Sequence, residues 1–149
     1  MSVFVENGQI DSMDQKIIEI LRDDGRASAS HISDQVGLSI PAVSERIKKM
    51  QESGLIKGFF ADIDLQKAGY DVQVIITLVS ETSEYYSIIV DNAKNSPGIV
   101  QCFTTTGNGS HVLLAATKDT TSLEKLLREI QGWPGVIRTE TQLIMKSYL

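Results

Sequence analysis

The sequence is short of the residues that mark exported, disulfide-bonded or membrane-spanning chains. Its 149 residues include one cysteine, Cys102, which has no internal partner for a disulfide and fits a reducing compartment as a buried, reduced side chain. No uninterrupted apolar run approaches the roughly 18 residues of a membrane span. Residues 1–10 lack the basic front of a signal peptide. We expect a cytoplasmic protein that does not contact a membrane.

Histidine is also scarce, which bears on catalysis and metal binding. His31 and His111 are the only histidines, and they fall in different predicted domains. Neither has the neighbours that a metal site or a catalytic triad requires. We expect no enzyme activity, no metal and no cofactor, with His31 at the surface and His111 lining or bordering a subunit interface.

Positive charge is in deficit, because the net charge is −5. Residues 1–62 hold 7 Lys/Arg against 10 Asp/Glu, and residues 63–149 hold 7 against 9. The stretch 39–58 is locally basic, with four Lys/Arg against two Glu. A basic face on an acidic body is compatible with DNA binding, but it predicts modest affinity per subunit, with multimers adding the rest.

Apolar residues recur at spacings of three and four in three short segments near the start. Capping residues predict helices that begin at Asp11 or Asp14, at Ser28 or Ser30, and at Ser39. A glycine-containing turn between the second and third helices is typical of a helix-turn-helix. Periodicity alone fits an ordinary helical domain with a solvated basic face equally well. The alternating stretch 55–64 predicts a two-stranded wing.

The third helix, residues 39–50, is the candidate recognition helix. Its apolar stripe leaves small residues free to approach base edges and basic residues free to reach phosphates. The candidate DNA-contacting residues are Ser39, Pro41, Ala42, Ser44, Glu45, Arg46, Lys48 and Lys49. The alternative for the basic residues is a solvated helix face, and for Ala42 and Ser44 an inert surface.

Residues 66–71 indicate a hinge, after which the pattern changes to β-α-β-β-α-β. The expected elements are strands at 72–79, 99–106, 111–117 and 138–146, and helices at 84–95 and from Ser122. This order predicts an α+β, ferredoxin-like domain. One face of such a sheet is left bare by the helices, and a second subunit is the simplest cover for it.

Several short motifs, in this order and spacing, resemble the Lrp/AsnC family of leucine- and asparagine-responsive regulators. They are residues 10–14, 36–39, 43–47 and 52–58, Thr106-Gly107, residues 134–136, and Thr139 with Thr141. The resemblance implies a winged helix-turn-helix with N-terminal arm and wing at residues 1–64. It implies a ferredoxin-like (RAM/ACT-like) domain for oligomerisation and effector binding at residues 65–149. Such proteins form homodimers that often assemble into octameric or larger rings, with double-stranded DNA outside.

The resemblance also places a small-molecule effector pocket between dimers. The matching residues here are Thr104, Thr105, Thr106, Gly107, Asn108, Gly109, Ser110, Thr139 and Thr141. Members that respond to amino acids usually have an Asp where this chain has Ser110. A hydroxyl offers only a neutral hydrogen bond to an ammonium group, and Thr104 is equally well explained as a strand former.

Three functions follow from these observations. The leading one is a DNA-binding transcription regulator whose DNA affinity or assembly responds to a small metabolite, with an amino acid favoured. The second is an architectural DNA-binding protein with no effector, which the missing Asp favours slightly. The third is an enzyme similar to siroheme decarboxylases, which is disfavoured because the C-terminal half offers only His111, Arg128 and Arg138 for such chemistry.

Overall fold

The computed structural model describes residues 10–148. The chain divides into two units between Asp62 and Ile63, whereas the sequence places the boundary after residue 64. None of the helices formed by residues 10–148 is long and apolar enough to cross a membrane.

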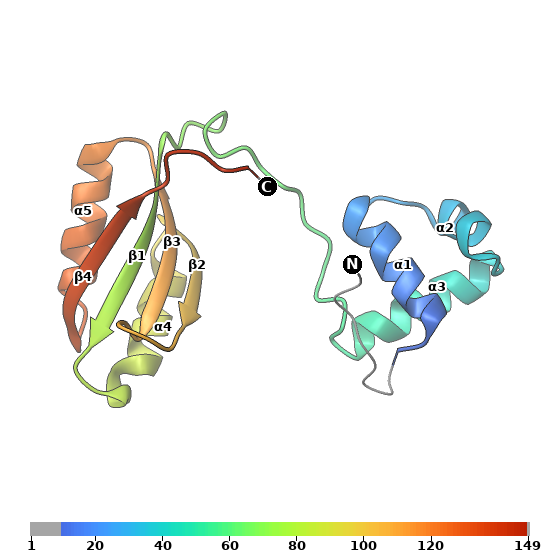
Figure 1. The fold of residues 1–149 in the computed structure, drawn as a ribbon, viewed down its shortest axis with the longest axis horizontal. Coiled ribbons are helices and arrows are strands. Elements are labelled where there is room, and N and C mark those ends of the chain that lie inside the picture. Colours follow the sequence, from blue (N-terminus) through green and yellow to red (C-terminus); the bar gives the residue numbers. More distant parts are fainter. Residues whose placement is uncertain (1–9, 149) are drawn as a thin grey trace. The chain divides into compact units, whose positions relative to one another are not determined.

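The first unit contains three helices, α1 (Ser12–Asp23), α2 (Ala29–Val36) and α3 (Ile40–Glu52) (Figure 1). Their N-caps are Asp11, Ser28 and Ser39, each of which accepts a backbone hydrogen bond from the first turn. The turn between α2 and α3 passes through Gly37, whose φ of 71° favours glycine. Apolar residues from all three helices form one buried core: Ile17, Ile32, Val36, Val43 and Met50. The predicted helix-turn-helix is confirmed.

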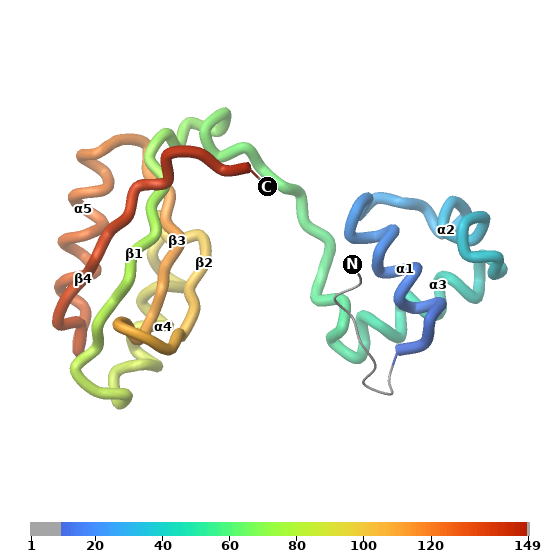
Figure 2. Tube along the Cα trace, in the orientation of Figure 1, coloured from blue at the N-terminus to red at the C-terminus, as the bar shows by residue number. Residues whose placement is uncertain are grey.

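The predicted two-stranded wing is not formed. Residues 55–64, all within the described range, contain no strand, and Figure 2 shows the irregular path that leads from α3 to β1. The N–H of Ile56 donates back to the carbonyl of Met50, which continues the end of α3 and does not start a ladder. The side chains of Phe60 and Ile63 are 86% and 58% exposed. Since this stretch has no buried face, nothing in the chain fixes a strand register.

The second unit is a four-stranded antiparallel sheet with two helices. Its elements are β1 (Val72–Ser80), a 3-10 turn (Ser83–Tyr85), α4 (Tyr86–Asn95), β2 (Ile99–Thr104), β3 (His111–Thr117), α5 (Thr120–Gln131) and β4 (Val136–Leu143). The strand order is β2-β3-β1-β4. The β-α-β-β-α-β sequence with this order is the predicted ferredoxin-like arrangement.

Several boundaries differ from the prediction: β1 ends at Ser80, α4 begins at Tyr86 and β2 ends at Thr104. For α5 and β4 the local interactions that decide the boundary are visible. The N-cap of α5 is Asp119, whose carboxylate accepts from the N–H of Ser122 at 2.7 Å, so the helix begins before Ser122. Strand β4 begins at Val136, directly after Gly135 turns the chain with a φ of 81°. It ends at Leu143, which pairs with Val74.

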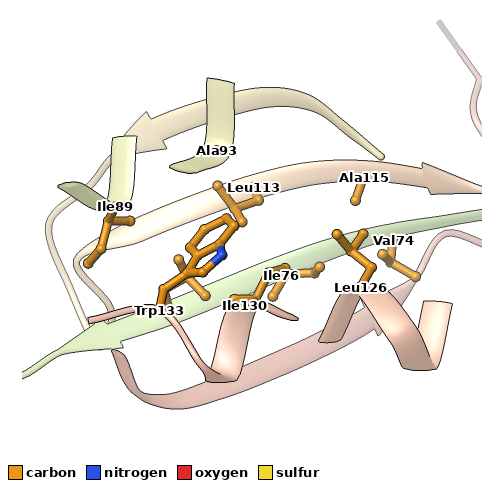
Figure 3. Close-up of a cluster of buried hydrophobic side chains, with 10 residues drawn as sticks. Val74, Ile76, Ile89, Ala93, Leu113, Ala115, Leu126, Ile130 and Trp133 are labelled. Atoms are coloured by element: carbon orange, nitrogen blue, oxygen red, sulfur yellow. The ribbon is translucent and has the colours of Figure 1, made fainter. Parts of the chain in front are cut away.

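The core of the second unit lies on one face of the sheet, under both helices. Alternate residues of β1 and β3 meet side chains of α4 and α5 (Figure 3). The members include Val74, Ile76, Leu113, Ala115, Ile89, Ala93, Leu126, Ile130 and Trp133. The other face contains the cross-strand row Phe103, Val112 and Thr77. Phe103 is 50% exposed there, so the helices of the second unit leave this face bare.

Candidate DNA-binding helix and effector turn

Helix α3 begins where the sequence predicts. The Ser39 hydroxyl accepts from the N–H of Ala42 at 3.3 Å, and Pro41 occupies the first turn, where its missing N–H costs nothing. Pro41, Ser44 and Lys48 are exposed, and their spacing places them along one stripe of the helix. That stripe faces away from the core side of Val43 and Met50 and is available to a ligand as large as DNA.

Arg46 is engaged by two carboxylates of its own chain. Its Nη1 lies 2.7 Å from Oδ2 of Asp11 and 2.8 Å from Oδ1 of Asp14. Asp11 and Asp14 also form the capping box of α1. The Asp14 N–H and then the Arg46 guanidinium lower the pKa of Asp11, and the two carboxylates raise the pKa of Arg46. Arg46 therefore ties α3 to the start of α1.

The two lysines of α3 are far more exposed. The side chain of Lys48 is 75% exposed and lies 3.7 Å from Glu52, and that of Lys49 is 71% exposed and lies 3.2 Å from Glu45. Both pairs have the i,i+4 spacing of a helix surface, where ion pairs contribute little to stability. These ammonium groups can leave their partners for a phosphate at small cost.

A groove of about 900 Å³ runs along one flank of α3. It is lined from α3 and the residues after it, and from the start of α1: Ala42, Glu45, Arg46, Lys49, Met50, Ser53, Gly54, Leu55, Ile10 and Asp14. The DNA candidates thus divide into two groups. Ala42, Glu45, Arg46 and Lys49 line the groove, whereas Pro41, Ser44 and Lys48 are not among its lining residues.

The turn between β2 and β3 joins most of the predicted effector residues. Thr104 ends β2 and is exposed, as are Thr106 and Asn108. Gly107 has a φ of 104°, a conformation that favours glycine. The N–H of Thr105 donates to the carbonyl of Ser110 at 3.0 Å, which closes the turn. Its exposed hydroxyls and amide side chain suit a small polar ligand.

Ser110 is not part of that exposed surface. It is 8% exposed, and its Oγ lies 2.8 Å from Nδ1 of His111 and 3.4 Å from the carbonyl oxygen of Leu78. His111 is fully buried and packs edge-to-face on Tyr86, with ring centroids 4.7 Å apart. Tyr86 of α4 in the same chain therefore covers His111, and the expectation that His111 borders a subunit interface stays a prediction. His31 is exposed, as predicted.

Thr139 and Thr141 lie away from the turn. Thr104, His111, Leu78 and Thr139 are successive partners across the sheet, so Thr104 and Thr139 sit on opposite edge strands, about 14 Å apart at the usual strand spacing. The Thr139 hydroxyl accepts from the side chain of Gln131 at 3.2 Å, while Thr141 is exposed. One chain does not bring these threonines together with the turn.

The remaining candidates for special chemistry are unremarkable in this fold. Cys102 is a free, half-buried thiol packed against the core, and burial raises its pKa. Among residues 10–148, no three His, Cys, Asp or Glu side chains are grouped to hold a metal ion.

Comparison with known proteins assigns both units. A family model described as winged helix-turn-helix DNA-binding matches residues 10–57, and one described as the Lrp/AsnC ligand binding domain matches residues 71–149. The fold and these matches define a DNA-binding protein with an attached ligand-binding domain. The second match alone spans more than half of the chain, and the chain belongs to the Lrp/AsnC family of transcription regulators.

Similar proteins cover almost the whole chain. The HTH-type transcriptional regulator FL11 of Pyrococcus horikoshii is 38% identical over 93% of this chain and 91% of its own length. Regulatory protein AsnC of Haemophilus influenzae is 32% identical over 93% of each. Among solved structures, AsnC of E. coli has a TM-score of 0.83 at 24% identity and covers 94% of this chain and 95% of its own. The solved AsnC structure therefore shares the fold of this chain.

Proposed function

We propose that this chain is a DNA-binding transcription regulator whose DNA affinity or assembly responds to a small metabolite, with an amino acid favoured. The observation that supports this most is the pairing of a helix-turn-helix with a ligand-binding domain in one chain. A structural neighbour from Neisseria meningitidis was solved as an L-Met complex, with a TM-score of 0.84 at 21% identity over 92% of this chain and 90% of its own. Free amino acids are therefore the first ligands to test.

In the DNA complex, the stripe of Pro41, Ser44 and Lys48 faces the major groove. Ser44 lies against base edges, and Lys48 and Lys49 bind phosphates. Ser39 orders the helix start, while Ala42 and Glu45 lie beside the groove that Lys49 shares. Arg46, predicted from the sequence as a phosphate ligand, is assigned instead to holding α3 on α1, because its Nη1 is already bonded to two carboxylates.

The bare sheet face supports assembly into homodimers. Phe103, Val112 and Thr77 form a row on it, and removing such apolar area from water on both copies favours association. Dimers then join through the effector turns into an octamer or larger ring. In this assembly, Thr139 and Thr141 of one subunit meet the turn of another, which completes a pocket that one chain leaves open.

Regulation is favoured over catalysis by the burial of His111, the histidine of the second unit. His111 is fully buried, whereas Arg128 and Arg138 lie at the surface, where they pair with Glu124 and Glu140. An enzyme similar to siroheme decarboxylases would need its histidine at an accessible site. An architectural protein without an effector is the second candidate, because buried Ser110 stands where a carboxylate would bind an ammonium group.

The proposal is tested by recovering DNA fragments bound to the full chain in cells and measuring its affinity for them with and without each of the twenty amino acids. We expect selective binding that at least one amino acid changes, together with heat of binding in calorimetry. Selective binding with no calorimetric response and no change of assembly would favour the architectural candidate. Binding that is equal on all fragments would remove the regulator assignment.

A further inference from the structure

The turn at residues 105–110 is fastened to the core through a buried histidine. The Nδ1 of His111 contacts the Ser110 hydroxyl at 2.8 Å, and Ser110 is attached again through its N–H, which donates to the carbonyl of Leu78 at 2.8 Å. At the neighbouring Gly109, an added Cβ would lie 2.8 Å from that same carbonyl oxygen. The backbone of the turn therefore packs closely against β1 at this point. The shape of the exposed turn depends on this buried attachment.

The other ring nitrogen of His111 has nothing to bond. Within residues 10–148, Nε2 is the buried side-chain nitrogen or oxygen that lacks a hydrogen-bond partner. A neutral imidazole has one N–H donor and one acceptor, whereas an imidazolium must donate from both nitrogens. A second proton would therefore create a buried charge with an unsatisfied donor, which is costly at a fully buried position.

The neighbours that the structure describes for His111 provide no charge to compensate for that proton. Its cross-strand partners are Leu78 of β1 and Thr104 of β2, and its ring packs edge-to-face on Tyr86 of α4. Burial is accordingly the sole cause that lowers the pKa of His111. The closed turn excludes a proton that an open turn would accept.

We propose that His111 is a positioning residue for the turn at residues 105–110: its neutral imidazole holds Ser110 and the turn in place, and protonation releases them. Where the turn binds the effector, as proposed above, acidification weakens effector binding. That consequence rests on the proposed function. The release of the turn does not, because it follows from contacts within one chain.

The direction and size of the pH effect on the turn follow from the linkage between proton binding and turn opening. An exposed histidine has a pKa near 6.5, and that of buried His111 is lowered, so the open turn binds more protons than the closed one. The closed turn is most stable above about pH 6.5, and its stability falls as the pH decreases toward the pKa of His111 in the folded protein. For one proton, the open fraction rises by up to about tenfold per pH unit across that window.

Hydrogen exchange followed by mass spectrometry on the full chain tests this without any ligand. Exchange of the peptide containing residues 104–112, corrected for the intrinsic pH dependence, is compared at pH 7.5, 6.5 and 5.5. We expect it to accelerate by several-fold or more below pH 6.5, while a peptide from α5 does not change. His111→Phe retains an aromatic ring against Tyr86 but cannot be protonated, so its turn should exchange independently of pH.

His31→Phe is the matched control, because it removes the exposed histidine and should leave the full pH response of the turn. If His111→Phe does not fold, exchange at the imidazole C2 position of the native chain gives the pKa of His111 directly. A value at or above about 6.5 overturns the proposal, as does a turn whose corrected exchange is independent of pH. The expected exchange pattern without any amino-acid binding would leave this inference standing and refute the effector assignment alone.

Discussion

Lys48 gives the sharpest test of how the protein meets DNA. Its side chain is 75% exposed on α3 and lies 3.7 Å from Glu52, with which it forms an ion pair. An exposed pair of this kind is worth about 0–1 kcal/mol, so DNA phosphate competes with it easily. Replacing Lys48 with Ala should therefore remove a phosphate contact without disturbing the fold.

The expected magnitude follows from counterion release. Each lost phosphate contact reduces the slope of log K against log salt by about 0.9. A dimer that uses two α3 helices loses about 1.8. Between 50 and 200 mM salt, the parent should then lose roughly tenfold more affinity than Lys48→Ala, on the same counterion-release basis. Site preference should change little, because a phosphate contact has no sequence information.

Fluorescence anisotropy at four salt concentrations measures both slopes. The matched control is Lys67→Ala, which removes a lysine from outside the helix-turn-helix. Lys67 is 86% exposed and paired with Asp64 at 3.3 Å. This substitution changes the net charge identically and should leave the slope unchanged. Equal slopes for the parent and Lys48→Ala would exclude this stripe of α3 from the interface. If Lys67→Ala lowered the slope as much as Lys48→Ala, the change would reflect net charge and not a contact made by Lys48.

Three further predictions concern folding and assembly. Arg46→Met should lower the melting temperature of the helix-turn-helix, followed by circular dichroism. The backbone N–H of Asp14 and then Arg46 lower the pKa of Asp11, so the stability contributed by the Arg46–Asp11 pair is present above about pH 4 and is lost as the pH falls. If Arg46→Met left the dependence of stability on acid pH unchanged, Arg46 would not hold α3 on α1. Val112→Glu should reduce the mass in light scattering toward one chain, and an intact oligomer would exclude the bare sheet face. Gly135 has a φ of 81°, and a Cβ at this position would overlap the Tyr85 ring. Gly135→Ala should therefore lower the free energy of unfolding by about 2–4 kcal/mol in a denaturant titration.

Local signals were enough to predict most elements. The N-caps Asp11, Ser28 and Ser39 all hydrogen-bond within their own first turn, so the sequence within four residues determines them. The strand at 111–117 matches the structure at both ends, because its apolar run is flanked by a glycine turn and a charged loop. The prediction of a wing was wrong for the opposite reason. Alternation at 55–64 is compatible with a strand, but it does not supply a second strand to pair with.

Contacts between distant residues could not be predicted. Arg46 meets Asp11 and Asp14 across 35 and 32 residues, and no periodicity reports such a distance, so its basic charge indicated DNA. Ser110 and His111 are adjacent in sequence, yet their burial depends on α4 covering the end of β3. The resemblance to the Lrp/AsnC family placed Ser110 in the effector pocket. In the structure, the polar turn and the buried hydroxyl face opposite ways.

The charge distribution gives a physical reason why the proposed assembly would strengthen DNA binding. Residues 1–62 have three more acidic than basic residues, Arg46 is bonded to two carboxylates, and each lysine of α3 has a glutamate partner. One subunit therefore has few positive charges to give to DNA, and its affinity alone is low at physiological salt. Linking several helix-turn-helix units raises overall affinity by about 10² to 10⁴ with no new contact. If subunits join at the effector turn, as proposed, a ligand that changes this contact would control DNA binding through the number of units engaged, without touching α3.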